Sequence, residues 1–238
     1  MTIRLAFPTF IFERNLLDQE KYGKDAVSKE YIMTLKKEMD AWRKRDPKGR
    51  QISNRYTGWQ SQDGVEQHPA FAKIVRCIET ALRDEVQQFF RVHPDDAQVK
   101  IDNTWANIND KGAWNKPHKH NGCWMSGAFY IDAQGDEGDF VAMSQTDRIM
   151  GDFPHSQRMN ENEHLRPKTG MLYMFPSGMT HMVEPNKTDN ERYSISFNLG
   201  FHFKGERPTG EIPNWRWDET LFDITEDGKL IQVSTSEQ

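Results

Sequence analysis

Polar and apolar side chains alternate along residues 192–203. The apolar members at the start of this segment are Tyr193, Ile195, Phe197 and Leu199. The polar members are Arg192, Ser194, Ser196 and Asn198. A period of two residues is that of a β-strand with one buried face, because successive side chains point to opposite sides of the strand. Such a strand has to pair with others, so the segment predicts a sheet.

The same period marks other segments of the second half of the chain. The predicted strands are residues 99–109, 124–132, 138–143, 171–175, 181–184 and 192–203. The first part has the 3.6-residue period of helices at residues 30–45, with Ser28 as the N-cap, and at residues 69–90. Strands that follow supporting helices are typical of a barrel or sandwich covered on one side. We therefore expect a mainly β fold with supporting N-terminal helices (α+β).

The length of the chain predicts one domain over residues 1–238. It would consist of a helical support region (1–98), a β core (99–203) and a C-terminal extension (204–238). The polar stretch 145–169 has no clear period and lies between two predicted strands. Because a loop of this length in a compact domain often covers a binding site, we expect it to act as a lid.

Charge and cysteine content restrict the partners and the compartment. The net charge of −5 provides no global basic field, so nucleic acid is not an expected partner. Cys77 and Cys123 are the only cysteines and form no disulfide framework, which favours the reducing cytoplasm. No apolar run approaches the roughly 20 residues of a membrane span, so no membrane association is expected. Nothing in the sequence indicates the oligomeric state.

Three histidines form a candidate metal site. His118 and His120 are two positions apart, at the start of a segment that we predict to run as a strand into residues 124–132. On a strand, both imidazoles would point to one face. His181 begins a later strand and would be the third ligand. Imidazole binds Fe, Zn, Cu and Ni, so the ligand type does not select the metal, and two such histidines alone are more often structural.

Arg192 and Ser194 lie on the polar face of the last predicted core strand. If that face lines the inside of a barrel, a buried arginine requires an anionic partner. A guanidinium matches a carboxylate, and a hydroxyl two residues along can add a hydrogen bond. The pair therefore predicts a carboxylate-binding site, whereas a strand facing solvent would predict no ligand.

The order His118-x-His120, His181, Arg192-x-Ser194 resembles the motif order of the iron(II)/2-oxoglutarate oxygenases, in particular those with a W-x-N-x-N…H-x-H…SG-x-x-Y pattern. The resemblance covers roughly residues 99–203. It implies a double-stranded β-helix (a jelly-roll or cupin-like barrel), with Fe(II) as the cofactor and 2-oxoglutarate as the cosubstrate. The implied reaction is oxidation, usually hydroxylation, of a small-molecule or protein side-chain substrate that the sequence does not identify.

The resemblance also assigns roles to residues. His118 and His181 would bind the iron, and Arg192 and Ser194 the distal carboxylate of 2-oxoglutarate. Some oxygenases of this class have polar cosubstrate ligands 11 and 9 positions before the first histidine. Here those positions are Asn107 (118 − 107 = 11) and Asn109 (118 − 109 = 9).

Position 120 departs from the common family pattern, which has a carboxylate there. With His120 as the third ligand, three neutral imidazoles would leave the iron site with a net charge of +2 instead of +1, which strengthens its attraction to an anionic keto acid. In another register, His120 would pair with Gly122 as in halogenating relatives, but His118 would then have no role.

Two alternatives remain open from the sequence. One is a cupin-like metal-binding barrel without oxidative activity, for which three histidines and zinc suffice. The other is a metal-dependent isomerase or hydrolase, which would need a general base beside the metal. Arg192-x-Ser194 favours the oxygenase, because a barrel that only binds metal does not need a site for a carboxylate.

Overall fold

The computed structural model describes residues 9–18, 20, 26–50, 54–55, 58–91, 97–144, 162–203, 221–224 and 230–233. The chain divides into two compact units, residues 1–204 and 205–238. In the second unit, β12 (Leu221–Ile224) and β13 (Leu230–Val233) pair in an antiparallel manner. No helix in the described part of the chain is both long and apolar enough to cross a membrane.

Two helical regions of the first unit support its sheet. Helix α2 (Lys29–Arg45) begins where predicted, because the Ser28 side chain accepts a hydrogen bond from the N–H of Tyr31. The segment expected as one helix over 69–90 is divided. It opens with the 3₁₀ turn η3 (Pro69–Phe71), continues as α3 (Ala72–Ala81) and passes into the π-helix η4 (Leu82–Gln87). A shorter turn, η2 (Val65–Gln67), precedes them.

The six-stranded sheet forms the framework of the first unit. Its order is β1 (Phe12–Asn15), β9 (Met171–Pro176), β6 (Met125–Asp132), β11 (Arg192–Phe203), β4 (Ala97–Asn109) and β3 (Trp59–Gln60). All neighbouring strands are antiparallel. The four strands predicted in this sheet, at 99–109, 124–132, 171–175 and 192–203, are confirmed to within two residues at each end.

A five-stranded sheet forms the second layer. Its order is β2 (Asn54–Arg55), β5 (Trp114–His118), β10 (His181–Val183), β7 (Phe140–Ala142) and β8 (Glu163–Leu165). The two sheets do not share strands, so they make the two-sheet arrangement of a double-stranded β-helix and not a closed barrel. The predicted mainly β fold with supporting helices is confirmed.

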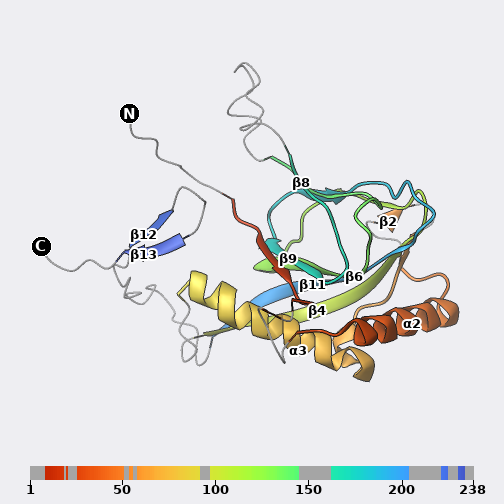
Figure 1. Cartoon of the computed structure of the whole chain (residues 1–238), viewed down its shortest axis with the longest axis horizontal. Coiled ribbons are helices and arrows are strands. Elements are labelled where there is room, and N and C mark those ends of the chain that lie inside the picture. The colour runs from red at the N-terminus through yellow and green to blue at the C-terminus, as the bar shows by residue number, and fades with distance from the viewer. Residues whose placement is uncertain are drawn as a thin grey trace, which may run out of the picture. The chain divides into compact units, whose positions relative to one another are not determined.

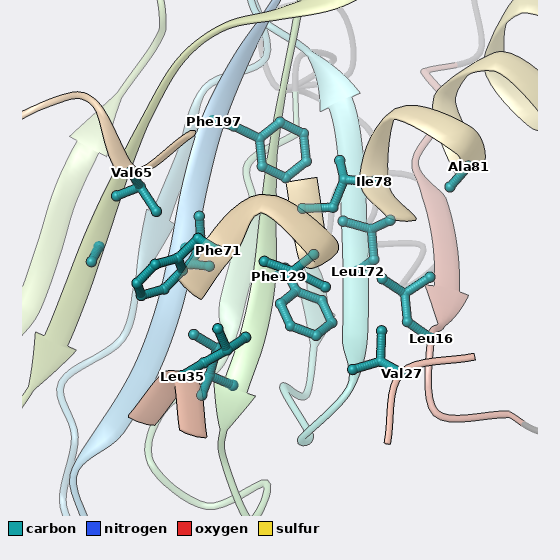
Figure 2. Close-up of a cluster of buried hydrophobic side chains, with 14 of the residues drawn as sticks. Leu16, Val27, Leu35, Val65, Phe71, Ile78, Ala81, Phe129, Leu172 and Phe197 are labelled. Atoms are coloured by element: carbon teal, nitrogen blue, oxygen red, sulfur yellow. The ribbon is translucent and has the colours of Figure 1, made fainter. Parts of the chain in front are cut away.

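The main core lies between the six-stranded sheet and the helices. Helices α2 and α3 run along one side of β4 and β11 (Figure 1). Leu35 of α2, Ile78 of α3, Phe129 of β6 and Phe197 of β11 are fully buried in one apolar cluster (Figure 2). Tyr193, Ile195 and Leu199 belong to the same cluster, so the apolar face of β11 packs on the helices and its polar face points the other way. That polar face meets the second sheet.

The prediction that one continuous strand carries both His118 and His120 is wrong. Strand β5 ends at His118 in the five-stranded sheet, and the chain then crosses to β6 of the six-stranded sheet. Gly122, in the connection, has a φ of +81°, a conformation that glycine adopts without strain. A turn therefore replaces the continuous strand, and His120 belongs to it.

The expected lid over 145–169 also needs correction where the structure describes it. Residues 163–165 form β8, which pairs with β7, because this segment completes the edge of the five-stranded sheet. Residues 145–161 of the expected lid lie outside the described residues, so its action as a lid stays a prediction.

Candidate active site

Strand register brings two of the three candidate metal ligands together. His118, the last residue of β5, is the direct partner of His181, the first residue of β10. His120 approaches from the turn after β5, and its Nε2 lies 3.3 Å from Nε2 of His181. Each of the three imidazoles offers one nitrogen, and these nitrogens lie within 4.8 Å of one another. The structure thus assembles the predicted triad through two strands and a turn.

Hydrogen bonds orient two of the rings. Nδ1 of His118 lies 2.6 Å from the carbonyl oxygen of Lys116, and Nδ1 of His181 lies 2.9 Å from that of Met179. Because a carbonyl only accepts, each Nδ1 carries the proton and each Nε2 keeps its lone pair. The ring of His120 is parallel to that of His181, with an interplanar angle of 2°. The indole of Trp105 also stacks on His120, with 5.9 Å between the ring centroids.

Burial keeps the three imidazoles neutral. Burial lowers the pKa of His118. It also lowers the pKa of His120 to about 4 and that of His181 to about 3, and the nearby His118 contributes a smaller part of both decreases. At neutral pH the cluster therefore presents unprotonated nitrogens and no mutual charge repulsion. A set of three neutral imidazole nitrogens fits a divalent transition-metal ion.

The polar face of β11 forms the floor of the pocket next to the triad. Its register places Arg192 opposite Asn109 and Ser194 opposite Asn107 on β4. On its other side, Ser194 is opposite Tyr130 of β6. The side chains of these five residues line one pocket together with His118, His120 and His181. Every residue singled out from the sequence thus lies around the same cavity.

Arg192 is a buried cation held by neutral groups. Its side chain is 2% exposed, and its Nη1 donates to the carbonyl oxygens of Glu137 and Gly138, both at 2.7 Å. Among the described residues no carboxylate forms an ion pair with it. A buried guanidinium without a contact ion pair is costly, even with the longer-range attraction of Glu137 and Asp139, so the arrangement suits an anionic ligand that enters the pocket.

Asn107 presents an unpaired polar atom to this pocket. Its Nδ2 lies 3.1 Å from Oγ of Ser196, whereas its buried Oδ1 has no hydrogen-bond partner. An amide assigned in the opposite orientation would accept from the Ser196 hydroxyl and leave an N–H donor free. In either orientation one amide atom is available to a polar ligand. Asn109 instead donates from Nδ2 to Oδ1 of Asn115 at 3.3 Å.

Tyr130 and Trp105 are pocket residues to which the sequence analysis gave no role in the site. Tyr130 lies beside Ser194, and burial raises the pKa of its hydroxyl to about 12, so it stays a hydrogen-bond donor. Trp105 shares a strand face with Asn107 and Asn109. The alternation along 124–132 places Tyr130 on the same face as Ser126 and Ala128, and this could have indicated it.

The remaining described histidines lie apart from the triad. His164 is next to Asp139 and Glu184, with ligand atoms within 4.8 Å of one another on partly exposed side chains. His202 pairs with Asp102 at 2.8 Å, and His68 accepts from the N–H of Ala70 at the start of η3.

Residues 103–198 match the family model described as "Putative 2OG-Fe(II) oxygenase". This part of the chain is similar to that family. All the predicted site residues fall within the match. The description of that family names iron(II) and 2-oxoglutarate, and the three histidines could hold a metal ion. Among curated proteins, none matches the chain.

Solved structures of other proteins share the fold. A prolyl-4-hydroxylase of Pseudomonas putida is similar with a TM-score of 0.56 and 14% identity, over 83% of this chain and 94% of that one. HygX of Streptomyces hygroscopicus, with nickel and 2-oxoglutarate bound, is similar with a TM-score of 0.51 and 10% identity, over 81% and 83%. The epimerase SnoN of nogalamycin biosynthesis is similar with a TM-score of 0.53 and 10% identity, over 80% of this chain and 77% of that one. At these identities the likeness establishes the double-stranded β-helix fold.

Proposed function

We propose that this oxygenase binds iron(II) through His118, His120 and His181 and hydroxylates a small molecule or a protein side chain. The observation that carries the proposal is the placement of three neutral imidazoles and one unpaired buried arginine around a single pocket. A metal barrel without a cosubstrate would account for the histidines alone. It would leave the buried charge of Arg192 without a purpose.

In this proposal the polar floor of the pocket binds the keto acid. Arg192 and Ser194 hold the distal carboxylate, and the hydroxyl of Tyr130, beside Ser194, adds a donor. Asn107 and Asn109 hold polar atoms of the cosubstrate nearer to the histidines. When bound, iron and 2-oxoglutarate would supply the oxidising chemistry, with dioxygen as the oxidant: the keto acid loses CO2 and takes one oxygen atom to become succinate, and the other oxygen atom oxidises the substrate. The protein contributes orientation and a pocket that excludes bulk water.

Among the described residues that line the site there is no carboxylate, so with three histidine ligands the iron would keep a net charge of +2. The dianion of 2-oxoglutarate would be attracted by this charge at one end and by Arg192 at the other. Two charged anchors at the ends of one pocket favour a dicarboxylate over a monocarboxylate.

The substrate class and the compartment belong to the same proposal. The similar P. putida protein is a prolyl-4-hydroxylase, and SnoN is an epimerase from nogalamycin biosynthesis, so we keep both a protein side chain and a small molecule as substrate classes. Cys77 and Cys123 are not bonded to each other, in keeping with the reducing cytoplasm.

The test is formation of succinate. Purified protein is loaded with iron(II), given 2-oxoglutarate and oxygen, and assayed with pools of small metabolites and of peptides. We expect slow iron-dependent succinate formation that one pool accelerates. If no keto acid is bound and no succinate forms in any pool, the cupin-like metal barrel is the better description.

A further inference from the structure

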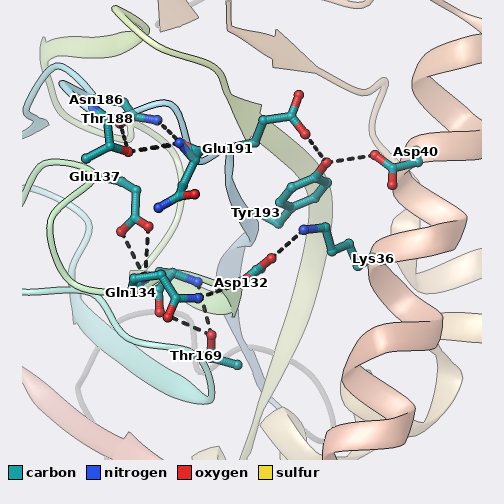
Figure 3. A network of polar contacts seen from close by, with 12 residues as sticks. Lys36, Asp40, Asp132, Gln134, Glu137, Thr169, Asn186, Thr188, Glu191 and Tyr193 are labelled. Carbon is teal, nitrogen blue, oxygen red and sulfur yellow. Dashed lines mark hydrogen bonds and ion pairs between the residues drawn. The ribbon is translucent and has the colours of Figure 1, made fainter.

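Glu137 is a buried carboxylate next to the site that the proposed function does not use. Its side chain is fully buried, and it lies in the turn between β6 and β7. The carboxylate accepts hydrogen bonds from three consecutive backbone N–H groups, those of Gln134, Gly135 and Asp136, at 2.9–3.3 Å. Figure 3 shows the side chain directed back at its own turn. The carboxylate thereby closes the turn from inside.

The same turn holds Arg192. The carbonyl oxygens of Glu137 and of the next residue, Gly138, both accept from its Nη1. Gly138 has a φ of +93°, and a Cβ there would lie 2.5 Å from the carbonyl oxygen of Glu184. The turn is therefore packed against residues 184–185 and cannot shift toward them. A closed turn of this kind fixes the position of two carbonyls, and through them the position of one end of the guanidinium.

The direction of the Glu137 side chain also determines what neutralises Arg192. A carboxylate paired with the guanidinium would compete with an anionic ligand for the same donors. Here the negative charge of Glu137 is satisfied by amides of the turn, and only its main-chain oxygen contacts Arg192. The arginine is thus held in place without being neutralised by a contact ion pair, so its charge remains available to a ligand.

We propose that Glu137 is a positioning residue for 2-oxoglutarate: it locks the turn whose carbonyls hold Arg192 in the orientation that receives the distal carboxylate. The inference rests on the proposed role of Arg192. It assigns no contact between Glu137 and the keto acid or the metal. It therefore predicts a selective effect on keto-acid affinity, whereas a purely structural role would affect stability alone.

The experiment compares wild type with Glu137→Gln in cobalt(II)-loaded protein, in which 2-oxoglutarate is titrated by calorimetry. The amide keeps the size of the side chain but replaces one acceptor oxygen by a donor that faces backbone N–H groups. We expect 2-oxoglutarate to bind about tenfold more weakly, a smaller loss than for Arg192→Met, because the guanidinium is displaced and not removed. The dissociation constant of cobalt(II) should stay that of the wild type.

Thr169→Val is the matched control. The hydroxyl of Thr169 accepts from the N–H of Ala133 and donates to its carbonyl oxygen, at the start of the same turn, and within the described part of the chain it forms no hydrogen bond with Arg192. It should lower the thermal stability without changing the affinity for 2-oxoglutarate. If Glu137→Gln does not accumulate as folded protein, Glu137→Asp, which keeps the charge on a shorter side chain, enters the same titrations.

The outcomes separate the inference from the proposed function. Weaker 2-oxoglutarate binding with unchanged cobalt(II) binding supports the inference. Wild-type affinity in the folded Glu137 variant, while Arg192→Met binds poorly, overturns the inference alone. An equal loss in Thr169→Val also overturns it, because any damage to the turn would then suffice. If wild-type protein binds no 2-oxoglutarate, the proposed function fails and the inference fails with it.

Discussion

At the level of single residues, metal binding should depend on the histidines that strand pairing brings together. His118→Ala or His181→Ala removes one of three nitrogens and, with it, the direct β5–β10 pair of ligands. We expect each variant to lose stoichiometric binding of iron(II) or cobalt(II), measured by metal analysis after gel filtration. His164→Ala, which alters the partly exposed cluster with Asp139 and Glu184, is the control and should keep full metal content. Wild-type metal content in both ligand variants would refute the assignment.

The role of Arg192 leads to a second prediction. Arg192→Met keeps a long side chain but leaves the distal carboxylate of 2-oxoglutarate buried and unpaired. This should weaken 2-oxoglutarate binding by about 2–5 kcal/mol, or about 30- to 4,000-fold. Metal affinity should barely change, because Arg192 is not one of the three proposed metal ligands. Ser194→Ala should show the same selectivity with a loss of about 1 kcal/mol, the worth of one net hydrogen bond.

For both variants, 2-oxoglutarate is titrated into anaerobic iron(II) protein, and the heat of binding is measured by calorimetry. Met182→Ala, a half-buried position next to His181 that is outside the pocket lining, serves as the control. Equal affinity in wild type and Arg192→Met would favour the metal barrel without a cosubstrate.

Residue types and spacing predicted residues that the structure brings together around one pocket, but not all of the geometry. The alternation along 192–203 correctly placed Arg192 and Ser194 on the face opposite to the apolar core. The same-face argument for His118 and His120 predicted their proximity for the wrong reason, because it assumed a strand where Gly122 makes a turn. The partner of His118 is set by register between strands that are more than 60 residues apart, which periodicity does not encode.

At the level of elements, the close packing of β6 against β11 gives a third prediction. Gly127 is on β6, and a Cβ there would lie 2.3 Å from the ring of Phe197 and 2.7 Å from the backbone oxygen of Tyr173. Because a backbone atom cannot move aside, Gly127→Ala should lower the free energy of unfolding by about 1–3 kcal/mol, the usual cost of overpacking. Urea unfolding followed by circular dichroism measures it.

Gly178→Ala is the control for that substitution, since a Cβ at Gly178 meets no atom within 4 Å. It should leave the free energy of unfolding within about 0.5 kcal/mol of the wild-type value. If both substitutions destabilise equally, the effect comes from loss of glycine and not from contact between β6 and β11.

Elements with strong periodicity were predictable, and some of the short ones were not, although β7 and β10 lie within the predicted strands 138–143 and 181–184. Helix α2 and the four long strands follow from their patterns because many residues repeat the period. Strands β2 and β3 have two residues each, and β8 has three, so their sequences contain no period to detect. They exist because neighbouring strands offer unpaired backbone groups, which is a property of the assembled sheets.

At the level of the whole molecule, the candidate site joins the two layers. His118 and His181 belong to the five-stranded sheet, whereas Arg192, Ser194 and Asn107 belong to the six-stranded sheet. The layers share no strand, so apart from the main chain they are held by side chains and by any ligand that contacts both. A ligand that contacts both the metal and Arg192 should therefore also stabilise the packing of the two sheets against each other.

This bracing predicts a stepwise gain in thermal stability. Metal alone at a hundred times its dissociation constant should add about 2.7 kcal/mol, if it does not bind the unfolded chain. For a unit of this size that is about 5–10 °C in Tm. Addition of 2-oxoglutarate should raise Tm further, because in the proposed site it also contacts the six-stranded sheet through Arg192, and a chelator should reverse both steps. Differential scanning calorimetry of wild type, His181→Ala and Arg192→Met resolves the steps. His181→Ala should lose the metal step, and Arg192→Met should keep it but lose the step due to 2-oxoglutarate. A 2-oxoglutarate step of wild-type size in Arg192→Met would mean that the keto acid does not join the two layers through this arginine.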